Sequence, residues 1–141
     1  MSSRKSRGLR NCNPGNIRHS KVRYRGEKSV STDSAFKQFE SLEAGYRAMF
    51  VLLHTYKVRG YGSTIAQMIS RYAPPSENNT EAYISRVVSS SKVGRDEVLD
   101  TLNPEQMVPI VSAMSAVENG VAADCEAVKR GWDIFIEDFG E

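Results

Sequence analysis

The chain has 141 residues, 40% of them hydrophobic and 26% charged, and its formal net charge is +2. This length and apolar content predict one domain with a packed core, and no run approaches the roughly 18 apolar residues of a membrane-spanning helix. Two cysteines are too few for a disulfide framework, and the two isolated histidines have no metal-ligand spacing. We therefore expect neither a disulfide scaffold nor a metal or organic cofactor.

Charge is unevenly distributed along the chain. The first 28 residues contain nine Lys and Arg residues and one acid, Glu27, whereas the C-terminal end is acidic. We interpret residues 1–6 as a flexible basic arm and residues 7–141 as a single domain. Such an arm suits a polyanion, either nucleic acid or the anionic bacterial envelope, but pairing with the acidic end explains it equally well. No RNP-like, helix-turn-helix or zinc signature supports nucleic-acid binding.

The chain up to about residue 40 is predicted to be irregular, with one small β element. Asparagine, proline and glycine are concentrated between residues 11 and 16, where they favour tight turns. Short strands are predicted at 17–25 and 34–39, and residues 26–33 would join them into a hairpin.

Five helices are predicted after residue 40, because apolar residues recur there at i, i+3 and i+4. Residues suited to cap a helix N-terminus precede these apolar stripes, and glycine or proline follows several of them. The expected helices begin after Ser41, at Ser63 or Thr64, at Thr80, after Asn103 and at about Ala122. The predicted fold class is mainly α (α+β), a helical domain with a small N-terminal β element.

One carboxylate stands at the end of an apolar helix stripe, in the sequence Val117-Glu118-Asn119-Gly120. Apolar surroundings penalise the charged form of Glu118 and raise its pKa, as a general acid near neutral pH requires. From spacing alone, a solvated glutamate beside an ordinary helix C-cap is the simpler interpretation. The catalytic interpretation depends on the asparagine-rich turn, the aromatic strand and the loop at 72–80.

Four segments resemble, in the same order, phage and prophage proteins described as virion structural proteins. They are Arg-Gly-Leu-Arg-Asn-Cys-Asn-Pro-Gly-Asn-Ile-Arg at 7–18, the pair Phe36 and Phe39, the segment Gly45 to Ala48 and the loop Ala73 to Thr80. The resemblance covers most of the chain. It implies a place in a phage particle and no particular activity.

A second resemblance is to lysozyme-like glucosaminidases of the flagellar and autolysin type, in a rotated order. The turn at 13–18, the strand at 36–39 and the segment at 71–83 match theirs, and Glu118 matches their acid. In those enzymes the acid lies upstream of the turn, so a circular permutation would be needed to relate the two orders. This chain departs from them at Asn119, where they have serine, and in its longer loop after Ala73.

The second resemblance implies a lysozyme-like domain that cleaves the β-1,4 glycan strand of peptidoglycan, as a muramidase, glucosaminidase or lytic transglycosylase. It assigns Glu118 as the general acid, with Asp33 as the first candidate for a second catalytic group and Glu40 and Glu77 next. A transglycosylase would need only one acid, because the acetamido group of the substrate supplies the second. The candidates for substrate binding are Tyr72, Tyr83, Asn13, Asn16 and Asn79. Each of these residues also has an ordinary structural explanation, as a surface carboxylate, a helix stripe or a turn.

Three functions remain open at this point: a bacteriolytic cell-wall hydrolase of endolysin type, a non-catalytic virion structural or wall-binding protein, and a nucleic-acid-associated packaging protein. The partners they imply are peptidoglycan glycan strands, virion components and, through the basic arm, nucleic acid. The N-terminus lacks the apolar region of a secretory signal. We expect synthesis in the bacterial cytoplasm, followed by action in the periplasm and cell wall or as part of a virion.

Overall fold

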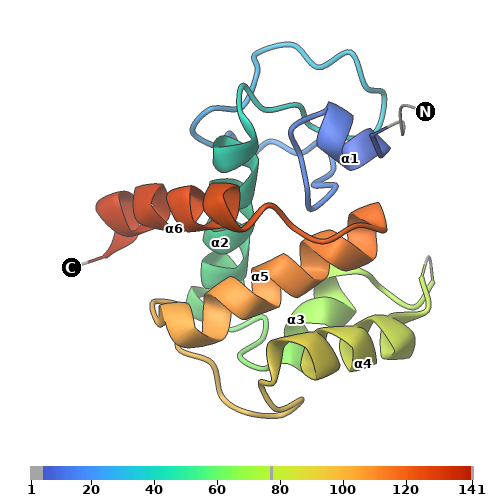
Figure 1. The fold of residues 1–141 in the computed structure, drawn as a ribbon, viewed down its shortest axis with the longest axis vertical. Helices are drawn as coiled ribbons and strands as arrows, with labels where there is room; N and C mark the ends of the chain where they lie inside the picture. The colour runs from blue at the N-terminus through green and yellow to red at the C-terminus, as the bar shows by residue number, and fades with distance from the viewer. Residues whose placement is uncertain (1–4, 77, 141) are drawn as a thin grey trace.

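The computed structural model describes residues 5–76 and 78–140 and confirms a mainly helical protein (Figure 1). Most of the predicted arm, residues 1–4, and the candidate Glu77 lie outside the described residues. None of the described helices is long and apolar enough to cross a membrane. The helices are α1 (Arg7–Arg10), α2 (Leu42–Val58), α3 (Ile65–Tyr72), α4 (Thr80–Ser91), α5 (Pro104–Asn119) and α6 (Cys125–Phe139).

Side-chain caps set where the helices begin. The capping oxygens of α2 to α6 belong to Ser41, Thr64, Asn79, Asn103 and Asp124. At α4 the cap is Asn79, one residue before the predicted Thr80, whose hydroxyl instead donates to the carbonyl of Ala73 at 2.5 Å. Helix α5 ends as predicted at Gly120, which has a φ of 71° and so takes the left-handed conformation that favours glycine.

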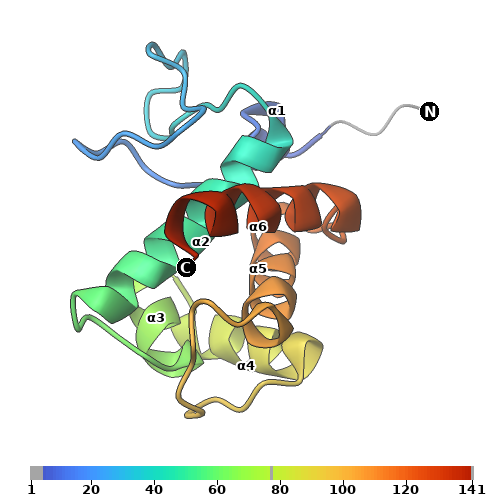
Figure 2. The ribbon, with the colours of Figure 1, turned by 90° about the vertical axis from the view of Figure 1, so that its left-hand side faces the viewer.

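The hydrophobic core is built by the longer helices. Helices α2 and α6 pack against each other, while α5 contacts both α4 and α6 (Figure 2). Between α2 and α6, the ring of Phe50 lies 5.0 Å from Trp132 and 5.9 Å from Phe135, measured between centroids. Burying a side chain of this size contributes about 1.5 to 3 kcal/mol. Helix α5, whose C-terminal end carries Glu118, is held by its packing against α4 and α6.

The predicted N-terminal hairpin is not present as regular strands in the described residues. Two isolated antiparallel bridges replace it, one between Arg18 and Phe36 and one between Glu27 and Phe39. The second half of the predicted hairpin divides its backbone hydrogen bonds among three partners: residues 35 and 37 bond to 17–19, residues 38 and 40 bond to 26–28, and the Phe39 N–H donates to the Asn11 carbonyl. None of these pairings is long enough to form a ladder, so the segment remains irregular.

Buried polar side chains hold this N-terminal segment, which we define as residues 11–40. Asn13 is fully buried, and its amide donates to the carbonyls of Ile17 and Lys37, both at 2.9 Å, and accepts from the Ile17 N–H. The ammonium of Lys37 donates to the Val22 carbonyl at 2.8 Å and pairs with Glu27 at 3.0 Å. Because these groups are satisfied, their burial does not carry the usual penalty of an unpaired polar group.

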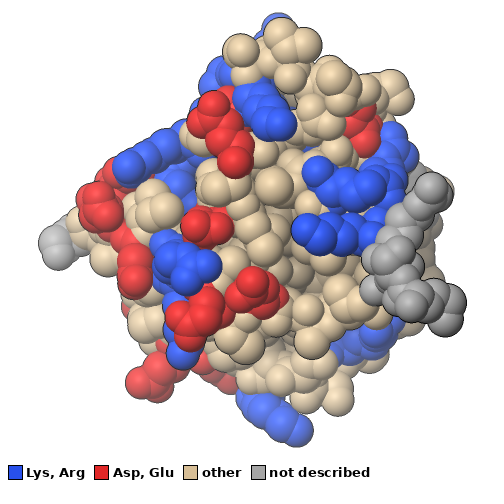
Figure 3. Space-filling model, turned by 45° about the horizontal axis from the view of Figure 1, so that its top comes forward, with Lys and Arg blue, Asp and Glu red and all other residues tan. Residues whose placement is uncertain are grey.

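Several basic residues of the N-terminal part are paired with acids. Arg25 reaches Asp138 of α6 at 3.0 Å, and Arg47 of α2 reaches the same carboxylate at 2.8 Å. The top of the molecule shows blue Lys and Arg side chains interspersed with red Asp and Glu (Figure 3). Pairing between the basic start and the acidic end of the chain, one of the two explanations of the charge pattern, is therefore present in the structure.

Candidate active site

Three segments that are distant in sequence meet at the carboxyl group of Glu118. The Asn16 Nδ2 donates to Oε1 of Glu118 at 2.9 Å, across 102 residues of chain. The Tyr83 hydroxyl, on α4, donates to Oε2 at 2.9 Å. The fold thus brings the late acid to the early asparagine turn, as the second family resemblance requires.

Burial raises the pKa of the Glu118 carboxyl above its ordinary value. The hydrogen bonds from Asn16 and Tyr83 and the positive charge of Arg18 act in the opposite direction, but burial is the largest effect. Burial, together with the negative charge of Glu118, also raises the pKa of the Tyr72 and Tyr83 hydroxyls well above their ordinary value. The site therefore combines two phenols whose pKa values are well above the ordinary value with a carboxyl whose pKa is raised by burial.

Glu118 opens onto a hollow of about 160 Å³ at the surface. Its lining residues are Gly15, Asn16, Arg18, Phe36, Tyr72, Ala73, Pro74, Asn78 and Glu118. A neighbouring hollow shares Asn78 and continues past Tyr83 to Arg86, while another shares Asn16, Arg18 and Tyr72. These three neighbouring hollows share lining residues, and we refer to them together as the trough.

Two larger hollows, of about 260 and 360 Å³, lie away from Glu118. The first is lined mainly by apolar side chains between α1, α2 and the start of α6, and the second lies between α5 and α6. Their carboxylates, Asp124 in the first and Glu105 and Asp133 in the second, are all exposed. Size alone therefore does not identify the chemical site, since only the trough contains a half-buried carboxyl with a raised pKa.

The turn that presents Asn16 is held by close contacts. Asn16 has a φ of 50°, in the left-handed region that asparagine tolerates better than most residues. A Cβ on Gly15 would lie 2.3 Å from the Tyr72 hydroxyl oxygen and 2.9 Å from Met49, so glycine is required there. The Tyr72 hydroxyl itself donates to the Gly15 carbonyl. Helix α3 thus also fixes the turn, through Tyr72.

Asn119 connects the end of α5 to the same turn. Its Nδ2 donates to the carbonyls of Pro14 at 2.8 Å and Ser115 at 2.9 Å, and its Oδ1 accepts from the Ser6 hydroxyl at 2.6 Å. The residue at which this chain departs from the glucosaminidases therefore has a structural role. It places the acid beside the turn.

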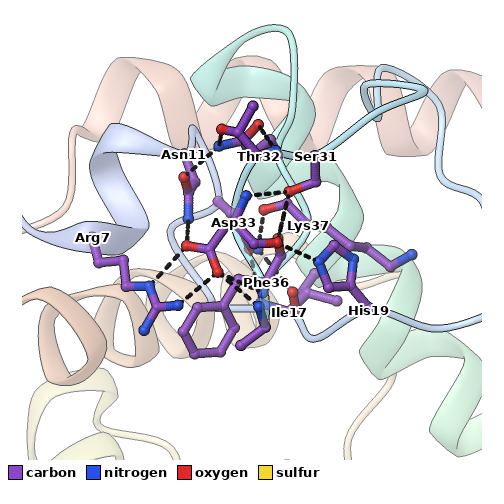
Figure 4. A network of polar contacts seen from close by, with 12 residues as sticks. Arg7, Asn11, Ile17, His19, Ser31, Thr32, Asp33, Phe36 and Lys37 are labelled. Carbon is purple, nitrogen blue, oxygen red and sulfur yellow. Dashed lines mark hydrogen bonds and ion pairs between the residues drawn. The ribbon is translucent and has the colours of Figure 1, made fainter.

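The structure places Asp33 outside the lining of the Glu118 hollow, in a polar network of its own (Figure 4). Its oxygens accept five hydrogen bonds: two from Arg7, one from Asn11 and one each from the backbone N–H groups of Ala35 and Phe36. The Arg7 guanidinium and these donors hold the pKa of Asp33 well below its usual range. Such a carboxylate is a stable anion with its acceptor positions occupied.

The other predicted site residues divide into two groups. Tyr72 and Asn16 line the hollow, and Tyr83 contacts the acid directly. Asn13 is buried in the turn and Glu40 is exposed, while Asn79 is exposed, caps α4 and lines the neighbouring hollow that continues to Arg86. The sequence analysis did not identify Arg18 and Asn78 as lining residues. Arg18 is the last residue of the predicted turn at 13–18, but nothing in its spacing indicates which way it faces.

Comparison with known proteins gives one informative match. The chain is 36% identical to Protein P5 of Pseudoalteromonas phage PM2 over 132 residues, which are 91% of this chain and 81% of that protein. No protein-family model matches the chain.

Proposed function

Because the chain belongs to the family of phage proteins that includes Protein P5 of Pseudoalteromonas phage PM2, we propose that it is a virion-associated protein that cleaves peptidoglycan glycan strands. The family supports the association with a phage. The catalytic part of the proposal rests on the geometry around Glu118 and on the resemblance to lysozyme-like glucosaminidases. In this proposal the helical domain is lysozyme-like.

The observation that carries the catalytic proposal is the state of the Glu118 carboxyl. It lines an open trough, burial raises its pKa, and Asn16 and Tyr83 fix its two oxygens. Glycoside cleavage requires a carboxylic acid that donates a proton to the leaving oxygen, with room for sugar on both sides of the bond. In this proposal the neighbouring hollows of the trough provide that room.

Asp33 is not the second catalytic group in this proposal, because its oxygens are already occupied by five donors. Its role is to hold Arg7, whose guanidinium lies 4.6 Å from the centre of the Phe36 ring, and Phe36 lines the hollow. Glu118 is the one carboxylate among the described lining residues. We therefore assign stabilisation of the sugar's positive charge to the substrate's own acetamido group. Glu77→Gln tests this assignment: retained cleavage supports it, and loss of cleavage contradicts it.

Aromatic and amide side chains of the trough would bind the sugar rings. Phe36 and Tyr72 offer faces on which the C–H surface of a sugar packs, and Asn78 offers an amide for an N-acetyl group. Arg18 and Arg86 stand along the trough, where a cation suits the carboxylates of peptidoglycan. Asn13 and Asn79, considered as binding residues from the sequence, are assigned structural roles.

The experiment is digestion of purified sacculi by the whole protein, followed by mass spectrometry of the soluble products. Muropeptides ending in a reducing sugar indicate a hydrolase, and anhydro-sugar ends indicate a transglycosylase. No soluble product at any protein concentration would contradict the catalytic proposal.

A second candidate is a non-catalytic virion structural or wall-binding protein with the same fold. Membership of a family of phage proteins favours this candidate more directly than the catalytic one, because the relative supports a phage protein and no particular activity. This candidate predicts that the protein sediments with sacculi or with purified virions without releasing glycan fragments. The digestion experiment therefore separates the two candidates.

A further inference from the structure

The side-chain oxygen of Asn16 is buried and accepts no hydrogen bond. It is the one buried side-chain nitrogen or oxygen without a partner in the part of the chain that the structure describes. The other end of the same amide donates to Glu118. An unsatisfied acceptor beside the proposed acid is a costly arrangement that an alternative orientation of the amide would relieve.

Oxygen atoms gather on the side of Asn16 that faces Gly8. A Cβ on Gly8 would lie 2.8 Å from Asn16 Oδ1, 2.5 Å from Asn119 Oδ1 and 2.9 Å from the Asn13 carbonyl oxygen. All three oxygens are acceptors. Because glycine has no side chain, the point around which these three acceptors lie is left open.

The orientation of the neighbouring Asn119 amide is fixed. Its Nδ2 donates to two carbonyls, so its Oδ1 must face Ser6 and Gly8. Only Asn16 is free to exchange its nitrogen and oxygen, since an asparagine amide has nearly the same shape in both orientations.

We propose that the Asn16 side-chain amide flips, exchanging the positions of its nitrogen and oxygen, when Glu118 takes up a proton. In the carboxylate state, Nδ2 donates to Oε1, as in this structure. In the acid state, Oδ1 accepts the proton held on Oε1, and Nδ2 donates toward Asn119 Oδ1 and the Asn13 carbonyl. Asn16 is then a positioning residue that holds the acid in both states, and this role rests on the proposed function of Glu118.

The amide flip places the catalytic proton on a defined oxygen of Glu118. Tyr83 continues to donate to Oε2, so the proton resides on Oε1, the oxygen that faces Asn16. When the Oε1–H bond breaks and the proton passes to the leaving oxygen, the Asn16 amide flips back to its first orientation. Its Nδ2 then stabilises the Glu118 carboxylate. The other titratable or charged groups that act on Glu118 are Arg18 from the N-terminal segment and Tyr72 from α3.

The test is an NMR titration that does not depend on activity. The Glu118 carboxyl carbon and the Asn16 side-chain amide are followed in the whole protein across the titration of Glu118. We expect the Asn16 amide resonances to change with the same midpoint as the carboxyl carbon, and the amide of Asn78, which lines the same hollow without a contact to Glu118, to show no such change. An Asn16 amide that remains donor to Oε1 throughout would overturn the proposal.

Substitution of Ser6 provides a second test at a residue that does not touch Glu118. Ser6→Ala frees Asn119 Oδ1 from its present donor and favours the orientation in which Asn16 donates to it. The midpoint of Glu118 should then rise by roughly 0.3 to 1 pH unit. Ser41→Ala, which removes the serine cap of α2, serves as the control and should leave the midpoint unchanged.

A Glu118 titration midpoint that stays constant in Ser6→Ala contradicts the proposed amide flip. Loss of the α1 cap is the competing cause of any effect, because the Ser6 hydroxyl also accepts from the Leu9 N–H. Unchanged α1 amide resonances in the variant exclude that cause. Absence of glycan cleavage would contradict the proposed function and would leave the result of this titration unaffected.

Discussion

The N-terminal segment and the helical body, residues 42–139, are stabilised in different ways. The body buries aromatic and aliphatic side chains such as Leu53 and Phe135 between regular helices. The N-terminal segment has no regular strand or helix among residues 12–40 and instead buries Asn13 and Lys37 with their partners. The comparison shows that an irregular backbone is held in place by polar side chains that bond to its carbonyls. The proposed site lies where the two regions meet.

The largest expected effect comes from breaking the buried ion pair of the N-terminal segment. In Glu27→Gln, the ammonium of Lys37 keeps its burial, at 1% exposure, but loses its carboxylate. We expect the free energy of unfolding to fall by about 3 to 5 kcal/mol, measured by urea denaturation. Glu40→Gln, at an exposed position of the same segment, should change it by less than about 0.5 kcal/mol. Equal effects of the two substitutions would show that the segment does not depend on this pair.

A comparable loss in the body should come from an apolar cavity. Leu53 of α2 is fully buried, and Leu53→Ala should lower the free energy of unfolding by roughly 2 to 5 kcal/mol. Leu53→Met keeps the volume and should cost less than about 1.5 kcal/mol. A small effect of the alanine variant in urea denaturation would mean that α2 is not packed as described.

The contribution of Asp33 to the stability of the N-terminal segment should depend on pH. Its pKa in the folded protein is well below its ordinary value, so the ionised carboxylate stabilises the fold above about pH 4, the unfolded pKa, and this contribution is lost as the pH falls toward the folded pKa. The difference in unfolding free energy between the wild type and Asp33→Asn should therefore shrink from pH 7 to pH 3. A difference that is constant over this range, measured by urea denaturation, would contradict the role of Asp33.

The smallest effect concerns the tuning of the acid. Tyr83→Phe removes a hydrogen bond to the Glu118 carboxylate, a bond that lowers the pKa, so the pKa of Glu118 should rise by roughly 0.3 to 1 pH unit. Because the acid acts in its protonated form, the alkaline limb of the cleavage–pH profile should move upward by the same amount. The control is Tyr46→Phe, which removes a hydroxyl that contacts Ser115 and not Glu118; this variant should leave the pH profile in place.

The helices could be predicted from the sequence because their signals are local. The stripe of α2 contains Tyr46, Met49 and Leu53, which recur at helical spacing and are all fully buried. Gly120 ends α5 for a reason that is also local, since its backbone takes the left-handed conformation. The β element was wrong in detail, because the pairing of residues 35–40 depends on side chains that cross the segment.

The candidate site could be predicted in part. Family resemblance brought Glu118 and the asparagine turn together, and the contact between Glu118 and Asn16 is present. The contact with Tyr83 depends on how α4 packs against α5, and the sequence contains no sign of that packing. Asp33 was the first candidate for a second catalytic group, but the five donors that occupy it come from residues whose approach depends on the folded segment.

The most direct test compares rates of muropeptide release from purified sacculi by the wild type, Glu118→Gln and Glu105→Gln. Glu105 is an exposed carboxylate at the opposite end of the same helix, which makes it the matched control. Losing a positioned general acid lowers the rate by about 10²- to 10⁴-fold, so we expect that loss in Glu118→Gln alone, with an unchanged circular dichroism spectrum. Release by Glu118→Gln at the wild-type rate would contradict the catalytic account.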